Sequence, residues 1–359
     1  MRPTIHRIPV EEGMVEGFAE RLSEINQAIE EADKRFVGRS EDGISAAQKD
    51  LTGYRTDLGD IFDELGSSLI GSREARIKPW IEVLLEQTPP AEWRDIEIIF
   101  SPHYLLNLLP LHAATWEGKP LIEHWPVAYL PSPTLAGQFL KKLKNESSEE
   151  KSALDGQAAI FSPPRGLPLD KDFEKDAVVK QLKKTNRLKH QPFSGSEATP
   201  EELFSHALEA WLIHYCGHSQ LLTDNFLRSS LGMAGRDLEI EEMVSRLYLP
   251  KALLVYLGSC DSGQVIPGRA DELMALARVF LYAGSPTVLA SLWKLPEAVG
   301  ADFASYFYQA WLVQGKTLAA AFQNAVKRTR GKHGDKPDYW APWILIGAWQ
   351  TSITLPPVP

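Results

Sequence analysis

Two segments of the sequence end an apolar run in small and polar residues that can do covalent chemistry. The run 211–216 is followed by a glycine and His218, and the run 252–258 is followed by a serine and Cys260. A thiol is a strong nucleophile once it is partly ionised, and a neighbouring imidazole can take its proton and later protonate a leaving amine. Together the two side chains would make a dyad for the hydrolysis of amide bonds.

The same residues also have an interpretation without chemistry. A cysteine at the end of a buried strand often packs as a small apolar side chain. Glycine beside the histidine permits a tight turn and a close approach of the backbone, which favours the catalytic interpretation. Residue chemistry alone leaves both interpretations open.

Metal and nucleotide chemistry are not predicted by this sequence. Its 2 cysteines and 9 histidines do not fall at the spacings of a metal-ligand motif. No glycine-rich phosphate loop follows an early strand, which argues against a nucleotide-binding domain. We therefore expect no metal and no cofactor.

The elements that must position His218 and Cys260 are predicted to be strands of a mostly parallel sheet. Short apolar runs alternate with amphipathic segments, which is typical of a sheet covered on both faces by helices. Functional groups of such sheets collect beyond the carboxyl ends of adjacent strands. One crossover connection fits between the two runs, so we expect their strands to lie side by side, or nearly so. The expected strands are 96–100, 126–130, 157–161, 211–216, 252–258, 287–292 and a last one within 339–349, and the expected helices are 170–184, 199–209, 238–247, 271–283, 297–313 and 316–329.

The first ninety residues have a different pattern from the rest. Apolar residues recur there at spacings of three and four, from Val15 to Ile29, from Leu51 to Leu69 and from Ile77 to Leu85, which predicts helices. We expect a helical region over residues 1–90 and an α/β domain over residues 91–359. The charged stretch 141–156 is expected to be a surface excursion of that domain and the best candidate for self-cleavage.

Composition narrows the class of protein further. The chain has 359 residues, 24% of them charged, and a formal net charge of −9. A mildly acidic chain has no overall field that attracts nucleic acid, so direct nucleic-acid binding is not expected. Two cysteines cannot form a disulfide framework, and the sequence has neither an apolar signal segment nor a membrane-spanning run. We expect a soluble cytoplasmic protein without a membrane partner.

Several segments, taken in order, resemble the CHAT family of cysteine peptidases, which are relatives of caspases and separase. The resemblance covers about residues 95–350. It implies a caspase-like αβα sandwich with a mostly parallel central sheet, preceded by a small helical region. The segments that carry it are 98–112, 129–132, 214–218 (HYCGH), 257–263 (LGSCDSG), Glu272, 283–286, 291–293 (SLW) and 340–347.

The resemblance also implies which residues act. Cys260 is expected to be the nucleophile and His218 its acid/base partner. His214 and Cys216 lie inside the strand, and they are expected to be core residues rather than parts of the dyad.

Backbone donors and substrate contacts are expected on both sides of the dyad. Ser219 stands where the family commonly has glycine, and a serine restricts the backbone there. Three consequences are open at this point: a weaker second oxyanion donor, a hydroxyl supplied to the substrate, or no effect. Asp261 can orient its own loop or bind substrate. The expected oxyanion and substrate residues around the dyad are Gly217, Ser219, Ser259 and Asp261.

Glu297 and Asp302 are candidates for substrate specificity. Separases carry an acidic residue in the specificity pocket a few positions beyond the Leu-Trp pair, and both residues follow that pair here. An acidic pocket would favour Arg or Lys before the scissile bond through a charge-assisted pair. Both carboxylates can equally be helix N-terminal residues, since Pro296 begins a helical stretch.

The sequence thus predicts a cysteine endopeptidase that cleaves protein substrates. The resemblance implies regulation by a partner protein or ligand at the helical region, in a bacterial defence, antiviral or cell-death type of system. The alternative is a catalytically weak or inactive scaffold of the same fold that binds protein partners, and Ser219 is the feature that supports it.

Overall fold

The computed structural model describes residues 12–36, 41–70, 85–86, 88, 90–102, 104–132, 156–164, 173–185, 189–220, 222, 225–258 and 271–353. Three of the predicted site residues, Ser259, Cys260 and Asp261, lie outside these ranges. So do all of the predicted surface excursion except Gly156 and nearly all of the third predicted helix near residues 77–85.

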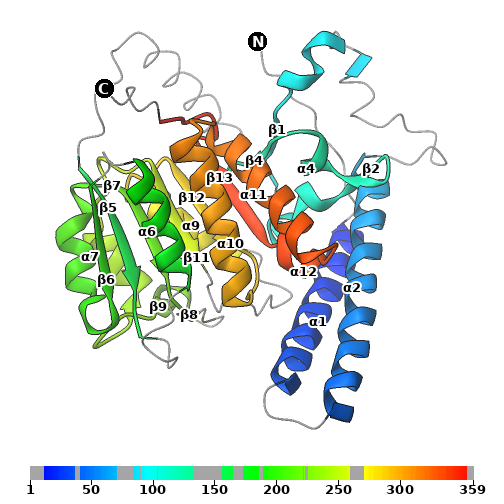
Figure 1. The fold of residues 1–359 in the computed structure, drawn as a ribbon, viewed down its shortest axis with the longest axis horizontal. Coiled ribbons are helices and arrows are strands. Elements are labelled where there is room, and N and C mark those ends of the chain that lie inside the picture. The colour runs from blue at the N-terminus through cyan, green and yellow to red at the C-terminus, as the bar shows by residue number, and fades with distance from the viewer. Residues whose placement is uncertain are drawn as a thin grey trace.

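An eight-stranded sheet lies at the centre of the α/β part of the molecule (Figure 1). Its order is β1-β4-β13-β12-β11-β7-β5-β6, and every neighbouring pair is parallel except β12 with β13. The sheet therefore consists of two parallel blocks that run in opposite directions. The strands are β1 Ile98–Phe100, β4 Val127–Tyr129, β5 Gln157–Ser162, β6 His190–Ser194, β7 Ala210–Cys216, β11 Leu254–Gly258, β12 Thr287–Ser291 and β13 Trp343–Gly347.

The continuous apolar runs explain the central strands. Every residue of β7, β11, β12 and β13 is buried, as expected for strands covered on both faces. All seven predicted strands are confirmed, and so is the mostly parallel α/β class. The edge strand β6 was not predicted, because Pro192 and its partly exposed neighbours break the apolar pattern.

Helices cover both faces of the sheet. In Figure 1, α6, α10 and α11 lie side by side in front of it, and α9 lies behind it with α8 packed against it. Local signals fix their ends: the Thr317 side chain accepts a hydrogen bond from the Ala320 N–H at the start of α11. The helices of this part are α4 Leu121–His124, α6 Phe173–Thr185, α7 Pro200–Ala207, α8 Ile240–Arg246, α9 Asp271–Tyr282, α10 Glu297–Tyr308 with a π-helical turn Gln309–Val313, α11 Leu318–His333 and α12 Pro337–Trp340.

Two long helices precede the sheet and confirm the first two predicted helical patterns. Helices α1 (Glu12–Phe36) and α2 (Glu41–Ile70) pack against each other and extend away from the sheet (Figure 1). Buried side chains of both belong to the same apolar core as the sheet. Arg55 of α2 binds the Asp338 carboxylate of α12 through two hydrogen bonds of 2.9 and 3.1 Å. The domain boundary near residue 90 stays a prediction.

Short elements complete the part of the chain that the structure describes. No helix in that part is both long enough and apolar enough to cross a membrane. The remaining strands are β2 Thr115–Trp116, β3 Lys119–Pro120, β8 Ser219–Gln220, β9 Ser230–Leu231 and β10 Leu238–Glu239, and the 3-10 turns are Pro90–Asp95, Tyr104–Leu108, Leu111–Ala113, Gly195–Glu197 and Phe226–Arg228.

Candidate active site

Strands β7 and β11 are adjacent and parallel, as the sequence predicted. Their register pairs Cys216, the last residue of β7, with Gly258, the last residue of β11. His218 and Cys260 each come two residues later in the chain. Neighbouring strands are only about 4.8 Å apart. The main chain therefore leaves the sheet toward both residues from adjacent positions, at the carboxyl ends of the two strands. The pairing of His218 with Cys260 itself stays a prediction.

Two hydrogen bonds hold the main chain of His218 just beyond the end of β7. Its carbonyl oxygen accepts hydrogen bonds from the Tyr215 hydroxyl (2.6 Å) and from the Gly232 N–H (2.8 Å). A Cβ at Gly217 would overlap the Tyr215 hydroxyl, so this close approach requires glycine. The His218 side chain is partly exposed. The Nδ1 of its imidazole is buried, so the exposed part of the residue lies elsewhere.

Ser219 begins β8 and pairs with Leu231 of β9 in an antiparallel ladder. Among the non-glycine residues that the structure describes, Glu117 alone has a positive φ. Ser219 is therefore in extended backbone, which serine adopts without strain, so the expected restriction carries no penalty in this structure. The roles of Gly217 and Ser219 in binding an oxyanion stay predictions.

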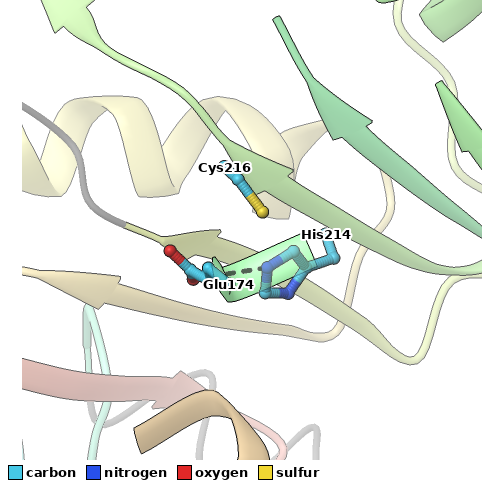
Figure 2. Close-up of side chains that lie close together, drawn as sticks. All are labelled: Glu174, His214 and Cys216. Carbon is cyan, nitrogen blue, oxygen red and sulfur yellow. Dashed lines mark ion pairs between the residues drawn. The ribbon is translucent and has the colours of Figure 1, made fainter. Parts of the chain in front are cut away.

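A buried cluster of polar side chains lies where β7 ends. Figure 2 shows Glu174 of α6 beside His214 and Cys216 of β7. The His214 Nε2 lies 3.3 Å from a carboxylate oxygen of Glu174, and neither side chain has any solvent exposure. The imidazole of His214 also stacks on the ring of Tyr256 in β11, with 4.3 Å between centroids. The cluster thus joins helix α6 to both strands that lead to the predicted dyad.

Tyr308 of α10 contacts the other side of His214. Its hydroxyl lies 2.8 Å from the His214 Nδ1. Burial raises the pKa of Tyr308 well above its ordinary value, with smaller contributions from nearby Cys216 and Glu174. The hydroxyl therefore keeps its proton at neutral pH and acts only as a hydrogen-bonding group. The Nδ1 of His214 thus has a hydrogen-bond partner, whereas its Nε2 lies close to the Glu174 carboxylate without making a hydrogen bond among the described residues.

The same cluster has the residue types of a metal site. One donor atom each from Glu174, His214 and Cys216 lies within 4.8 Å of the other two. Structural zinc sites have four protein ligands, and catalytic zinc sites have three and a position open to water. Among the described residues only these three donors converge, and all three are fully buried. The donor set fits neither kind of site, so we interpret the cluster as a buried polar network in which His214 hydrogen-bonds to Tyr308 and lies against Glu174.

Glu174 is the residue of this region that the sequence did not predict. Its neighbours Asp172, Lys175 and Asp176 make the start of the helix look solvated. The available signal was position: Glu174 lies on the same buried stripe of α6 as Val178, one turn later. A carboxylate on the apolar face of an amphipathic helix could have marked it.

The two specificity candidates lie in different surroundings. Glu297 is the first residue of α10, and its carboxylate accepts a hydrogen bond of 3.3 Å from the N–H of Phe173 in the first turn of α6. Asp302 accepts hydrogen bonds from the Lys332 ammonium (2.7 Å) and from the imidazole of His333 (2.8 Å) at the end of α11. The structure therefore brings Glu297, and not Asp302, to the helix turn that carries the buried cluster.

Comparison with known proteins gives one family match and two curated relatives. Residues 74–348 match the family model of the CHAT domain. Tetratricopeptide repeat protein 28 of Homo sapiens is 30% identical over 308 residues, which are 72% of this chain and 12% of the relative. The same protein of Mus musculus is 31% identical over 298 residues, 70% of this chain and 12% of the relative. The chain thus spans about an eighth of the length of these relatives.

Solved structures give more distant similarities. The separase–securin complex of Saccharomyces cerevisiae has 14% identity and a TM-score of 0.49, with 95% of this chain and 22% of that chain covered. The Arg-specific cysteine proteinase gingipain R has 14% identity and a TM-score of 0.43, with 56% of this chain and 48% of that chain covered.

Proposed function

Since this chain belongs to the CHAT-domain family, we propose that it is a cysteine endopeptidase with Cys260 as nucleophile and His218 as its acid/base partner. The observation that carries the proposal is the register of β7 and β11. It ends two paired strands at Cys216 and Gly258, each two residues before a member of the dyad.

The reaction follows from the chemistry of the two side chains. The imidazole of His218 takes the proton from the Cys260 thiol, and the thiolate attacks the carbonyl carbon of the scissile peptide bond. The amine leaves with the proton that His218 returns, and a thioester remains. Water, deprotonated by the same imidazole, hydrolyses the thioester and restores the thiol. We assign the oxyanion to main-chain N–H groups of Cys260 and of the Gly217–Ser219 turn, where one donor typically contributes about 10²–10³-fold in rate.

Glu297 is the better of the two candidates for substrate specificity. Its carboxylate lies at the start of α10, next to the first turn of α6. Asp302 is already engaged by Lys332 and His333. We assign to Glu297 the recognition of an Arg or Lys side chain before the scissile bond, through a charge-assisted hydrogen bond.

The helical pair α1–α2 is the proposed site of regulation by a protein partner or ligand. Arg55 of α2 binds Asp338, and the carbonyl oxygen of Asp338 accepts a hydrogen bond of 2.9 Å from the Trp293 indole. Trp293 belongs to the segment that leads into α10 and Glu297. A partner that shifts α2 would therefore act on the proposed specificity pocket. A defence or cell-death setting is part of this proposal and follows from family resemblance.

The test compares the two cysteines of the chain. Cys260→Ala is expected to lower peptide cleavage by at least about 10³-fold without a change in the unfolding midpoint. Cys216→Ala is the comparison, because Cys216 is buried in β7 and is not a member of the proposed dyad, and its cleavage is expected to stay well above that of Cys260→Ala. Cleavage is measured on a peptide library and by new N-termini in a proteome treated with the activated protein. An electrophilic peptide probe should label Cys260 and lose that labelling in His218→Ala.

The same experiments decide between the peptidase proposal and the scaffold alternative. Full cleavage by Cys260→Ala would end the proposal. No cleavage by the wild-type chain with candidate activators present, together with an ordinary thiol reactivity of Cys260, would establish a non-catalytic scaffold instead.

A further inference from the structure

The buried carboxylate of Glu174 touches the last residue of the strand that leads to the proposed nucleophile. A Cβ placed on Gly258 would overlap the Glu174 carboxylate, so the side chain lies directly against the β11 backbone. Gly258 is also the register partner of Cys216. The carboxylate therefore forms a wall against which the end of β11 packs, two residues before Cys260.

Four elements meet at this wall. Glu174 comes from α6, His214 from β7, Tyr308 from α10, and Gly258 from β11. The tyrosine hydroxyl lies 2.8 Å from the Nδ1 of His214, and the carboxylate lies 3.3 Å from its Nε2. The first contact is a directional hydrogen bond, and the second is a close approach of two buried polar groups that leaves little room for either element to shift.

Stability gives no reason for this arrangement. Removing a carboxylate and an imidazole from water is costly, and an apolar group of the same volume is often as stabilising or more so. A buried network at the ends of the two strands that lead to the proposed dyad therefore indicates a demand for geometry. In catalysis a displacement of about 1 Å can cost about 10²-fold in rate.

We propose that Glu174 and His214 are positioning residues that hold the end of β11 in the path that delivers Cys260 to the substrate. This inference rests on the proposed peptidase function. The network acts through the backbone of Gly258, so its loss lowers kcat and leaves KM nearly unchanged.

The decisive experiment replaces the network by apolar groups of similar shape. The triple variant Glu174→Met/His214→Phe/Tyr308→Phe removes the contacts of His214 with Glu174 and Tyr308 while it keeps the volume filled, so it is expected to unfold at the wild-type denaturant midpoint. Its kcat on the cleaved peptide is expected to fall about 100-fold, with KM within about twofold. The conservative Glu174→Gln keeps the wall against Gly258, and its kcat is expected to fall only about tenfold.

The matched control is a second buried His–Tyr pair far from the proposed dyad. His112 Nδ1 lies 2.8 Å from the Tyr129 hydroxyl, and β13 and β12 separate β4 from β11. The double variant His112→Phe/Tyr129→Phe is expected to keep kcat and KM within about twofold of wild type. A kcat of the folded triple variant within twofold of wild type would overturn the proposal. If that variant fails to fold, Glu174→Gln decides alone, and an unchanged kcat overturns the proposal.

A further readout separates this inference from the peptidase proposal. Amide hydrogen exchange of residues 254–258 is expected to speed up at least about tenfold in the triple variant and not in the control, whether or not any peptide is cleaved. Unchanged exchange would overturn the positioning role even in an active peptidase. One equivalent of zinc retained by the wild-type chain and lost from Cys216→Ala would also overturn it, because the carboxylate would then serve a metal.

Discussion

Two buried histidine–tyrosine pairs join the same sheet to neighbouring elements: His112 of the turn Leu111–Ala113 contacts Tyr129 of β4, and His214 of β7 contacts Tyr308 of α10. In each pair the Nδ1 of the histidine lies 2.8 Å from the tyrosine hydroxyl, and both imidazoles have no solvent exposure. His214 also has the Glu174 carboxylate 3.3 Å from its Nε2. Neither Nε2 makes a hydrogen bond among the described residues, and the ring of His112 instead packs edge-on against Phe322, with 5.5 Å between centroids.

His112 and Tyr129 contact each other twice, because the tyrosine hydroxyl meets both the main-chain N–H and the Nδ1 of His112. Burial lowers the pKa of His112 to about 3, so its imidazole is neutral at physiological pH. The Tyr129 oxygen accepts the His112 N–H at 3.0 Å and can donate its own proton to Nδ1. His214 of β7 instead contacts two helices that pack on one face of the sheet, α10 through Tyr308 and α6 through Glu174. The comparison teaches that a buried histidine indicates little by itself, and that the carboxylate beside it distinguishes a network from packing.

The largest expected effect comes from breaking the network with a single change. Glu174→Ala leaves the His214 Nε2 without this partner in a buried site and is expected to lower the free energy of unfolding by about 3–5 kcal/mol. The apolar triple variant is expected to stay within about 1 kcal/mol of wild type. Denaturant unfolding at pH 7 measures both. Equal losses of unfolding free energy in Glu174→Ala and in the triple variant would show that Glu174 and His214 contribute independently. The carboxylate would then no longer distinguish the His214 pair from the His112 pair.

The second prediction concerns the pH dependence of stability that arises from the His112–Tyr129 pair. The pKa of His112 is lowered in the folded chain, so below pH 6.5 the unfolded chain binds a proton that the folded chain does not. Its contribution to stability is thus complete above pH 6.5 and declines as the pH falls toward 3, by about 1.4 kcal/mol per unit. Between pH 7 and pH 5, His112→Phe is expected to lose about 2 kcal/mol less than wild type. Parallel losses in the two denaturation series would refute a neutral His112.

The fold was predictable wherever the signal is local. Continuous apolar runs located the central strands because burial on both faces leaves no polar position in the pattern. Apart from the adjacency of β7 and β11, the order of the strands was not predictable, and neither was the reversed direction of β13 against β12, since pairing between distant segments depends on the whole sheet. The edge strand β6 escaped because Pro192 and exposed neighbours mimic a loop.

The residues of the candidate site also divide into those that a local sequence pattern marks and those whose surroundings depend on tertiary packing. The position of His218 just beyond the end of β7 could be predicted because a glycine and the end of an apolar run mark it in the sequence, and its catalytic role stays a prediction. The engagement of Asp302 by Lys332 and His333 depends on the packing of α10 on α11, which no local pattern contains. Glu174 was not predicted for a similar reason, since the contacts of its carboxylate with His214 and Gly258 join segments that are distant in the sequence.

The smallest effect compares the two tyrosines. Tyr129→Phe removes the hydroxyl that contacts both the Nδ1 and the buried main-chain N–H of His112, and is expected to cost about 2 kcal/mol of unfolding free energy. Tyr308→Phe removes a single contact and leaves His214 beside Glu174, so we expect about 1 kcal/mol. Denaturation of the two variants side by side at pH 7 resolves this difference. A larger loss for Tyr308→Phe would mean that the hydroxyl, rather than the carboxylate, organises the network at His214, and Glu174 would then lose its place as the feature that separates the two pairs.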